Sequence, residues 1–375
     1  MVMTSSAPLV LLATTLPILI AASGDAQTIQ SPEVHRDGTV TFRLLMPPAQ
    51  KVEVHLDGIA GMTPITMTKE VTGVWSVTTQ PLTPDIYAYQ FAVDGQEIVD
   101  PNVRAYVSNY FEQGGLFTVP GSPAAIWEQT DVPHGAVSRH FYSSKTTGDQ
   151  RDYYVYTPPD FDPRSGKRYP VLYLLHGYSD YSDGWITMGR ANFILDNLIA
   201  QGKAMPMIVV MPSGYSVPAL LDHGEDAPKT PLWRLNLERF PEMLLGELVP
   251  LLEGTYPVRT DRNSRAIAGL SMGGGETVYT GLNHIDRFAW IAPMSAAIPA
   301  DLENSFPKLN ANQASRIKLL WIACGKQDFL YDENRNFRVW LSSKGIKFTS
   351  VETEGVHNWP VWRRNLADLL PALFR

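Results

Sequence analysis

Residues 27–120 consist of short segments in which apolar and polar side chains alternate, separated by Gly, Pro and Asp-Gly turns. Alternation with a period of two is typical of half-buried β-strands. No segment of helical period interrupts them, so this region predicts a small all-β sandwich. The clearest candidate strands are residues 40–45, 51–56, 74–78 and 86–93.

From residue 136 to the end, apolar runs alternate with segments of helical period. Continuous apolar strands connected by helices are typical of a mostly parallel sheet that helices cover on both faces. Residues 136–375 are therefore predicted to form an α/β domain. Candidate strands are two within 140–156, then 169–177, 205–211, 265–270, 288–294, 317–325 and 347–353; candidate helices are 192–200, 242–253, 276–282, 333–343 and 361–374. The stretch 214–240 shows neither pattern and predicts a long loop near the active site.

The composition is that of a folded protein with a sizeable core, since 44% of the 375 residues are hydrophobic and 18% are charged. The formal net charge of −7 leaves no basic surplus to neutralise phosphates, which argues against a nucleic-acid-binding protein. Cys324 is the only cysteine, so no intrachain disulfide can form, and its apolar neighbours indicate a buried structural thiol. No Cys/His cluster has zinc-ligand spacing, and we expect no metal or other cofactor.

An apolar run at residues 7–22 precedes a group of small residues. This order is typical of a secretory signal peptide, here residues 1–26, and the run is short for a membrane span. The first six residues lack the usual Lys or Arg, so an uncleaved anchor is the alternative. The prediction is an exported protein, secreted or periplasmic, that is free of the membrane after cleavage.

The sequence Gly269-Leu270-Ser271-Met272-Gly273 fits the pattern G-x-S-x-G. It follows a predicted strand and precedes a predicted helix, as in a nucleophile elbow, where a sharp strand-to-helix turn exposes the serine hydroxyl. Glycine is needed on both sides because bulk there would clash with the neighbouring backbone. Ser271 is therefore the candidate nucleophile. The alternative is a glycine-rich turn that only ends a strand.

A serine hydroxyl needs a general base, and the base needs a carboxylate that orients it. Hydrolases with this elbow place the acid and then the base after later strands. His357 directly follows the last predicted strand, whereas His284 lies near the end of the elbow helix and cannot reach back to Ser271. Asp328 follows the carboxyl end of the preceding strand, where such sheets place functional groups, and it is the candidate acid. Asp332, in the cap of the next helix, is the second choice.

Ester hydrolysis also needs backbone N–H groups aimed at the oxyanion that forms in the transition state. Met272, directly after the nucleophile, is predicted to supply one of them. The loop after His176-Gly177 supplies the other, and Tyr178 is the simplest candidate. His176 precedes the serine in the chain, and we expect it to support this loop by hydrogen bonds rather than to act as the base.

With these residues identified, the chain from about residue 135 to residue 375 resembles carbohydrate esterase family 1, the "putative esterase" group. Within it, the chain looks most like the feruloyl esterase modules attached to bacterial xylanases. The matching stretches are residues 169–177, 189–200, 265–275 and 322–325, with Asp328, His357 and Trp362. The resemblance implies an α/β-hydrolase fold and a serine esterase that needs no metal. The group also includes acetylxylan esterases, siderophore esterases, S-formylglutathione hydrolases and mycolyltransferases. The chain departs from it in a long loop at 213–233 and at 355–359, which replaces a glycine-rich lead into the histidine.

The β-rich region carries a second resemblance, to the early-set immunoglobulin-like domains of glycan-processing enzymes, including family-48 carbohydrate-binding modules. It rests on residues 73–75, 87–91, 94–95 and 100–102. It implies an immunoglobulin-like sandwich at 27–120, which a linker at 121–135 joins to the esterase domain at 136–375. Trp75, Tyr87 and Tyr89 are candidates for stacking on sugars, with burial in the sandwich core as the alternative.

Together these features predict an exported serine carboxylic-ester hydrolase that removes feruloyl or acetyl esters from plant cell-wall xylan. Its partner would be an esterified polysaccharide or oligosaccharide. Trp185 and Trp359 are candidates for contact with the substrate, and packing is an equal alternative for Trp185. Two other functions stay open: a siderophore (enterochelin-type) esterase, and a glycan-binding protein whose esterase domain is inactive.

Overall fold

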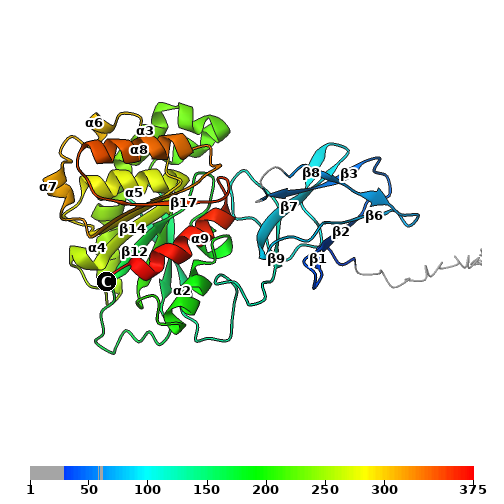
Figure 1. The fold of residues 1–375 in the computed structure, drawn as a ribbon, viewed down its shortest axis with the longest axis horizontal. Coiled ribbons are helices and arrows are strands. Elements are labelled where there is room, and N and C mark those ends of the chain that lie inside the picture. The colour runs from blue at the N-terminus through cyan, green and yellow to red at the C-terminus, as the bar shows by residue number, and fades with distance from the viewer. Residues whose placement is uncertain (1–28, 58, 60–61) are drawn as a thin grey trace, which may run out of the picture.

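The computed structural model of the chain describes residues 29–57, 59 and 62–375. The expected signal peptide at residues 1–26 lies outside these described residues. The chain forms a β domain and a larger α/β domain that lie side by side, and helix α9 (Trp359–Leu369) is on the side of the α/β domain that faces the β domain (Figure 1). Among the residues described, no helix is both long and apolar enough to cross a bilayer.

The β domain is built from two antiparallel sheets that pack face to face around one apolar core. The strand order is β1-β2-β6-β5 in the first sheet and β4-β3-β7-β8 in the second, where β9 also pairs with β7. The predicted all-β sandwich is therefore confirmed. The strands are β1 (Glu33–Val34), β2 (Val40–Leu45), β3 (Val52–Asp57), β4 (Ile65–Thr66), β5 (Thr68–Lys69), β6 (Val74–Thr78), β7 (Asp85–Val93), β8 (Gln96–Ile98) and β9 (Gly115–Val119).

Trp75, Tyr87 and Tyr89 belong to the core of the sandwich, where they are only 5%, 4% and 2% exposed. Their rings are covered inside the sandwich, so burial in the core is confirmed and the sugar-stacking alternative for these three residues is excluded. Their polar atoms are satisfied inside the domain. For example, the Trp75 indole N–H donates to the Met46 carbonyl at 2.9 Å, and the Tyr89 hydroxyl donates to Asp100 at 2.8 Å.

The α/β domain contains an eight-stranded sheet in the order β10-β11-β13-β12-β14-β15-β16-β17. β11 pairs antiparallel with both of its neighbours, and the remaining pairs are parallel. This mostly parallel sheet is the predicted α/β-hydrolase fold. The strands are β10 (Ala136–Ser143), β11 (Gln150–Thr157), β12 (Val171–Leu175), β13 (Ile208–Pro212), β14 (Arg265–Leu270), β15 (Trp290–Met294), β16 (Leu319–Gly325) and β17 (Thr349–Thr353).

Helices cover both faces of this sheet, as predicted (Figure 1). One apolar cluster lies between the sheet and α2 and α9, and the other lies between the sheet and α3, α4, α5 and α8. Alternate side chains along each strand therefore meet different helices. The remaining helices are α1 (Gly184–Thr187), α2 (Ala191–Ala200), α3 (Pro231–Met243), α4 (Val249–Thr255), α5 (Ser271–Asn283), α6 (Leu302–Ser305), α7 (Ala311–Ala314) and α8 (Tyr331–Ser343).

The stretch 214–240 is not the loop that the sequence predicts. Two 3₁₀ pieces, separated by a kink at Gly224, span Pro218–Lys229. Helix α3 then starts at Pro231 and runs through a π-helical turn, Leu244–Leu248, into α4. Proline suits the first turn of a helix because its missing N–H would have no intrahelical partner there. A second proline, Pro241, lies inside α3 and obscures its helical pattern in the sequence.

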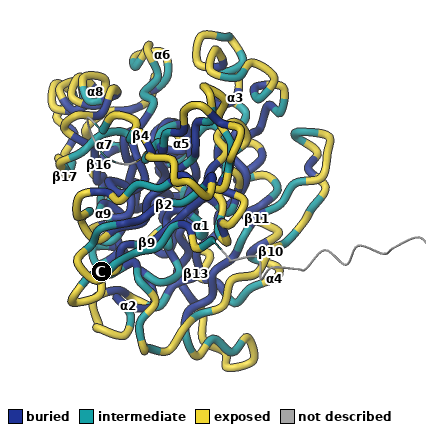
Figure 2. Tube along the Cα trace, turned by 90° about the vertical axis from the view of Figure 1, so that its right-hand side faces the viewer, coloured by how far each residue is buried: buried dark blue, intermediate teal, exposed yellow. Residues whose placement is uncertain are grey.

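The two domains share an apolar cluster at their junction. Ile86 of β7 and Leu116 of β9 belong to the same buried cluster as residues of α2 and α9. The predicted linker, residues 121–135, contains no helix or strand but is fastened to α2, where the Asn197 amide donates to two of its carbonyls, both at 2.8 Å. In the view from the side of the β domain, buried stretches run through both domains and exposed stretches are mostly loops (Figure 2).

Candidate active site

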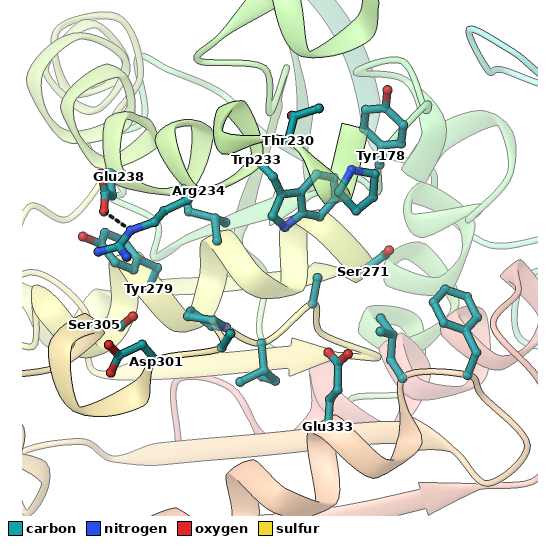
Figure 3. Close-up of a pocket in the computed structure, with 18 of the residues that line it drawn as sticks. Tyr178, Thr230, Trp233, Arg234, Glu238, Ser271, Tyr279, Asp301, Ser305 and Glu333 are labelled. Atoms are coloured by element: carbon teal, nitrogen blue, oxygen red, sulfur yellow. Dashed lines mark hydrogen bonds and ion pairs between the residues drawn. The ribbon is translucent and has the colours of Figure 1, made fainter. Parts of the chain in front are cut away.

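Ser271 lies at the turn between β14 and α5, and its backbone has a positive φ of 52°. A residue with a side chain is strained in this left-handed region. The flanking glycines make the turn possible, because a Cβ on Gly269 would lie 2.5 Å from the Gly273 carbonyl oxygen, and a Cβ on Gly273 would lie 2.4 Å from that of His176. The turn presents Ser271 to a cavity at this end of the sheet (Figure 3).

His357 follows β17 and meets Asp328, which follows β16. The Nδ1 atom of His357 lies 2.9 Å from both carboxylate oxygens of Asp328. Burial by itself raises the pKa of the Asp328 carboxyl, but the hydrogen bond and charge of His357, with hydrogen bonds from Leu330 and Ser295, hold that pKa below its usual value. An ionised Asp328 fixes the proton of neutral His357 on Nδ1 and leaves Nε2 as the proton acceptor.

His357 lines the same cavity as Ser271. The structure thus brings the predicted nucleophile, base and acid to one end of the sheet. His284 instead caps the carboxyl end of α5, at the opposite end of the helix from Ser271. Asp332 lies in the first turn of α8, where its side chain is 74% exposed and pairs with Arg335 at 3.1 Å. Neither of these two residues lines the cavity.

Of the two residues predicted to supply oxyanion-binding N–H groups, Met272 directly follows the serine and Tyr178 lines the same cavity as the serine. Met272 is in the first turn of α5, where backbone N–H groups have no intrahelical partner. Tyr178 lines the cavity. The loop that carries it is held by Asp180, which accepts the Gly177 N–H at 3.1 Å. Burial raises the pKa of the Asp180 carboxyl well above its usual value.

His176 supports this loop by hydrogen bonds, as expected. Its Nδ1–H donates to the Gly177 carbonyl at 2.8 Å, and its Nε2 accepts the Gly214 N–H at 2.9 Å. Burial lowers the pKa of His176 to about 4, so the ring is neutral at physiological pH. A neutral ring with both nitrogens occupied is a structural support and not a base.

The cavity has a volume of about 550 Å³ and is walled by aromatic and aliphatic side chains (Figure 3). Three carboxylates, those of Glu238, Asp301 and Glu333, also line it, together with the single guanidinium of Arg234. Arg234 is already paired with Glu238 at 2.7 Å. The cavity therefore suits an apolar or aromatic group and offers little to a strongly anionic ligand. Its apolar walls are formed by Tyr178, Trp233, Leu237, Tyr279, Ile298 and Phe329.

Trp185 and Trp359 do not contact this cavity, and the prediction that they bind substrate is wrong. Trp185 is fully buried, its indole N–H donates to the Leu175 carbonyl at 2.9 Å, and its ring packs against that of Trp359 with centroids 5.3 Å apart. Trp233 of α3 lines the cavity instead. The sequence signal for Trp233 was its place at the end of the unusually long stretch 213–233 beside the pocket. Within the part of the chain that the structure describes, no group of three His, Cys, Asp or Glu residues could hold a metal ion.

A strained serine beside a histidine that a buried carboxylate orients, all at one end of a mostly parallel sheet, defines a hydrolase of the α/β-hydrolase class. The family model described as "Putative esterase" matches residues 144–373, which is more than half of the chain. The chain therefore belongs to this esterase family, and it is a carboxylic-ester hydrolase.

Similar proteins include the "Endo-1,4-beta-xylanase/feruloyl esterase" of Xylanibacter ruminicola, which is 30% identical over 350 residues, or 92% of this chain and 46% of that protein. The "Acetyl esterase" of Caldicellulosiruptor saccharolyticus is 26% identical over 232 residues, or 53% of this chain and 80% of that protein. The chain thus spans about half the length of the first relative.

Two solved structures are also similar. A "ferulic acid esterase" is 28% identical with a TM-score of 0.53, over 65% of this chain and 98% of its own. The enterobactin esterase of Shigella flexneri has a TM-score of 0.66 over 93% of this chain and 97% of its own. At 18% identity, the second likeness concerns the fold alone, but it extends over both domains.

Proposed function

We propose that this esterase removes feruloyl or related hydroxycinnamoyl esters, or acetyl esters, from plant cell-wall xylan through a covalent acyl-enzyme. The observation that carries the chemistry is the pairing of His357 with the buried Asp328, together with the place of His357 and the elbow serine in the lining of one cavity. The substrate class draws its support from the aromatic walls of that cavity and from the printed activities of the feruloyl and acetyl esterase relatives.

In the proposed reaction, the Ser271 hydroxyl attacks the ester carbonyl carbon while Nε2 of His357 takes its proton. The Met272 and Tyr178 N–H groups stabilise the oxyanion that forms. The bond to the sugar oxygen then breaks, and His357 gives its proton to the leaving alcohol. Water attacks the acyl-enzyme by the same route, with His357 taking a water proton and returning a proton to Ser271. Asp328 stabilises the charged imidazolium in both halves.

The aromatic acyl group is proposed to lie between Trp233 and Phe329. Trp233 approaches from α3, while Phe329 is 76% exposed and its ring centroid lies 4.4 Å from that of His357. Two aromatic walls beside the reacting atoms would hold a planar cinnamoyl ring by stacking. An acetyl group would leave these walls unused, so the cavity favours the hydroxycinnamoyl ester over the acetyl ester.

A siderophore esterase is the second candidate, because the likeness to the enterobactin esterase extends over both domains. The charge of the cavity argues against a siderophore substrate. A catecholate siderophore is anionic, whereas the cavity carries three carboxylates and one guanidinium that is already paired. A glycan-binding protein with an inactive esterase domain is a weaker candidate still, because Ser271 and the His357 that pairs with Asp328 line the same cavity.

The test is a substrate panel with the purified protein: methyl ferulate, acetylated xylan and a catecholate siderophore, with Ser271→Ala as the control. We expect turnover of methyl ferulate that Ser271→Ala abolishes. Turnover of the siderophore alone would replace the proposed substrate class, and no turnover of any member would favour the inactive alternative.

We also propose that the protein is exported, on the strength of the apolar run at residues 7–22 and the small residues after it. Fractionation of the producing cell, with the amino-terminal sequence of the mature protein, tests this. Recovery of the full chain in the cytoplasm would contradict it.

A further inference from the structure

A second cavity lies where the β domain meets the α/β domain. It has a volume of about 440 Å³, and its lining shares no residue with that of the catalytic cavity. We refer to it as the junction cleft. Its lining includes Tyr106 and Tyr110 from the β domain and Tyr154 and Tyr181 from the α/β domain.

Three of the tyrosine rings that line the junction cleft are open to solvent, whereas Tyr215, which also lines it, is buried. Tyr106, Tyr110 and Tyr181 are 56%, 43% and 41% exposed, in contrast to the buried aromatic residues of the sandwich core. The rings of Tyr110 and Tyr181 belong to different domains and lie 4.1 Å apart between centroids. The two domains together thus form an aromatic wall that neither would form alone. Exposed aromatic rings that are grouped in this way are characteristic of binding surfaces.

Charged and hydroxyl groups lie beside these rings. Arg139 is held by Asp152, with its Nε atom 2.9 Å from the carboxylate, and by the face of Tyr154 at 5.6 Å from the ring centroid. Asp183 accepts hydrogen bonds from the hydroxyls of Ser108 and Thr187. Each carboxylate oxygen has lone pairs for a further donor. The cleft thus combines flat apolar faces with fixed, planar hydrogen-bonding groups.

This combination matches a sugar ring, which has apolar C–H faces and a rim of hydroxyl groups. Carboxylate and guanidinium groups can bind pairs of hydroxyls, while aromatic rings cover the faces. An anionic ligand would meet two carboxylates and one guanidinium already paired to one of them. The chemistry of the cleft therefore fits a neutral saccharide.

A run of ring contacts connects the junction cleft to the catalytic cavity. Tyr110 contacts Tyr215, Tyr215 contacts Tyr178, and Tyr178 contacts Trp233, with centroid distances of 5.7, 6.3 and 5.6 Å. Tyr178 and Trp233 line the catalytic cavity. The cleft and the reacting atoms are therefore only a few rings apart.

We propose that the junction cleft binds sugar units of the polysaccharide that carries the ester. This inference rests on the proposed function for the identity of the chain, but the cleft can be tested without turnover. A cleft of this kind raises the local concentration of polymer at the active site. Its contribution should appear with polymeric substrate and be absent with small soluble esters.

The test compares wild type with the double variant Tyr106→Ala/Tyr181→Ala. Retention by soluble arabinoxylan, mannan and mixed-linkage β-glucan in affinity gels measures binding. Hydrolysis of methyl ferulate and of feruloylated arabinoxylan measures function. We expect retention by arabinoxylan to weaken roughly fivefold to tenfold, and kcat/KM on the polymer to fall by a similar factor, mainly through KM. Turnover of methyl ferulate should stay within about twofold.

Two controls accompany this variant. Tyr106→Phe/Tyr181→Phe keeps the ring faces and should retain most of the binding, and Val71→Ala, at a fully exposed site of the β domain, should change nothing. Unchanged retention and unchanged polymer kinetics in the alanine variant would overturn the proposal. A second result would also overturn it: the wild type self-associates, and the alanine variant loses this self-association but is still retained by arabinoxylan. The cleft would then be a contact between copies of the chain. If wild type hydrolyses no ester, the proposed function fails while the retention assay still tests the cleft.

Discussion

The ion pair between Asp85 and Arg363 predicts that the β domain is a structural part of the esterase. Asp85 begins β7 and Arg363 belongs to α9, and they are 1% and 0% exposed. Arg363 donates to Asp85 at 2.6 and 3.1 Å, and its other donors reach the carbonyls of Met188 and Ile86 at 2.6 and 2.8 Å. In Asp85→Asn, the shape is kept but the buried guanidinium loses its countercharge.

The expected decrease in the free energy of unfolding follows from the burial of the ion pair. Removal of one partner from a buried ion pair typically costs about 3–5 kcal/mol, because an uncompensated charge remains in the interior. Because two carbonyls still bind Arg363 in the variant, we expect a loss near the lower end of this range. For a protein of this size, each kcal/mol shifts the melting temperature by about 2–4 °C, so the expected decrease is roughly 6–12 °C.

Urea unfolding followed by circular dichroism at neutral pH measures the free energy of unfolding, and a thermal scan measures the melting temperature. Glu33→Gln is the matched control, since it removes the charge of a partly exposed carboxylate that pairs with Arg43 in the same domain. Ion pairs open to solvent contribute little to stability. Replacement of the two buried partners by apolar residues, Asp85→Leu with Arg363→Met, should recover part of the loss. Arg364 also pairs with Asp85 at 2.8 Å, but it is 40% exposed and stays solvated in this double variant. A loss in Asp85→Asn no larger than that of the control would refute the reasoning.

Four further predictions concern the whole site. Ser271→Ala should reduce ester turnover by a factor on the order of 10⁴ to 10⁶ without unfolding, and near-wild-type turnover would contradict the mechanism. His357→Ala should reduce turnover as much as Ser271→Ala, and the double variant should be no less active than either single variant. His284→Ala should stay close to wild type. An inactive His284→Ala would mean that His357 is wrongly assigned as the general base. Asp328→Asn should lower kcat by roughly 10⁴-fold because the imidazole loses its orientation, and a loss below tenfold would exclude this role. A variant without residues 27–125 should lose turnover of methyl ferulate as well as of polymer, since the deletion also removes Asp85 and the β-domain part of the apolar cluster at the junction. Full activity on methyl ferulate would show that the domains are independent.

The candidate residues Ser271, Asp328 and His357 could be placed at one end of the sheet from the sequence, because each stands at a point where local rules are strict. Only glycine fits two positions before and two positions after Ser271, where a Cβ would lie 2.5 and 2.4 Å from backbone oxygens. The strand order then limits where an acid and a base can follow. Asp328 and His357 each come directly after a strand whose apolar run is unmistakable in the sequence, so their positions could be deduced without the structure.

The aromatic residues that line the two cavities were not predictable in this way. An aromatic residue in an alternating strand can point into or out of a sandwich, and its side depends on how the two sheets pack. Tyr87 and Tyr89 point inward, while Tyr106 is exposed in a segment without a strand pattern. Trp185 and Trp233 pose the same problem in the α/β domain. Trp185 follows a recognisable motif but packs in the core, whereas Trp233 belongs to a helix whose prolines conceal it.

The contacts between the two domains could not be predicted from the sequence for a related reason. Their presence changes how the role of the β domain must be tested. Asp85 and Arg363 are separated by 278 positions, so no local pattern connects them, and a linker rich in small residues suggests two independent modules. Because the buried pair and the shared cluster join the domains, deletion of the β domain removes structural support and any bound glycan at the same time. Loss of activity after deletion therefore says nothing about sugar binding. Only substitutions at exposed positions such as Tyr106, which leave the Asp85–Arg363 pair intact, can separate the two contributions.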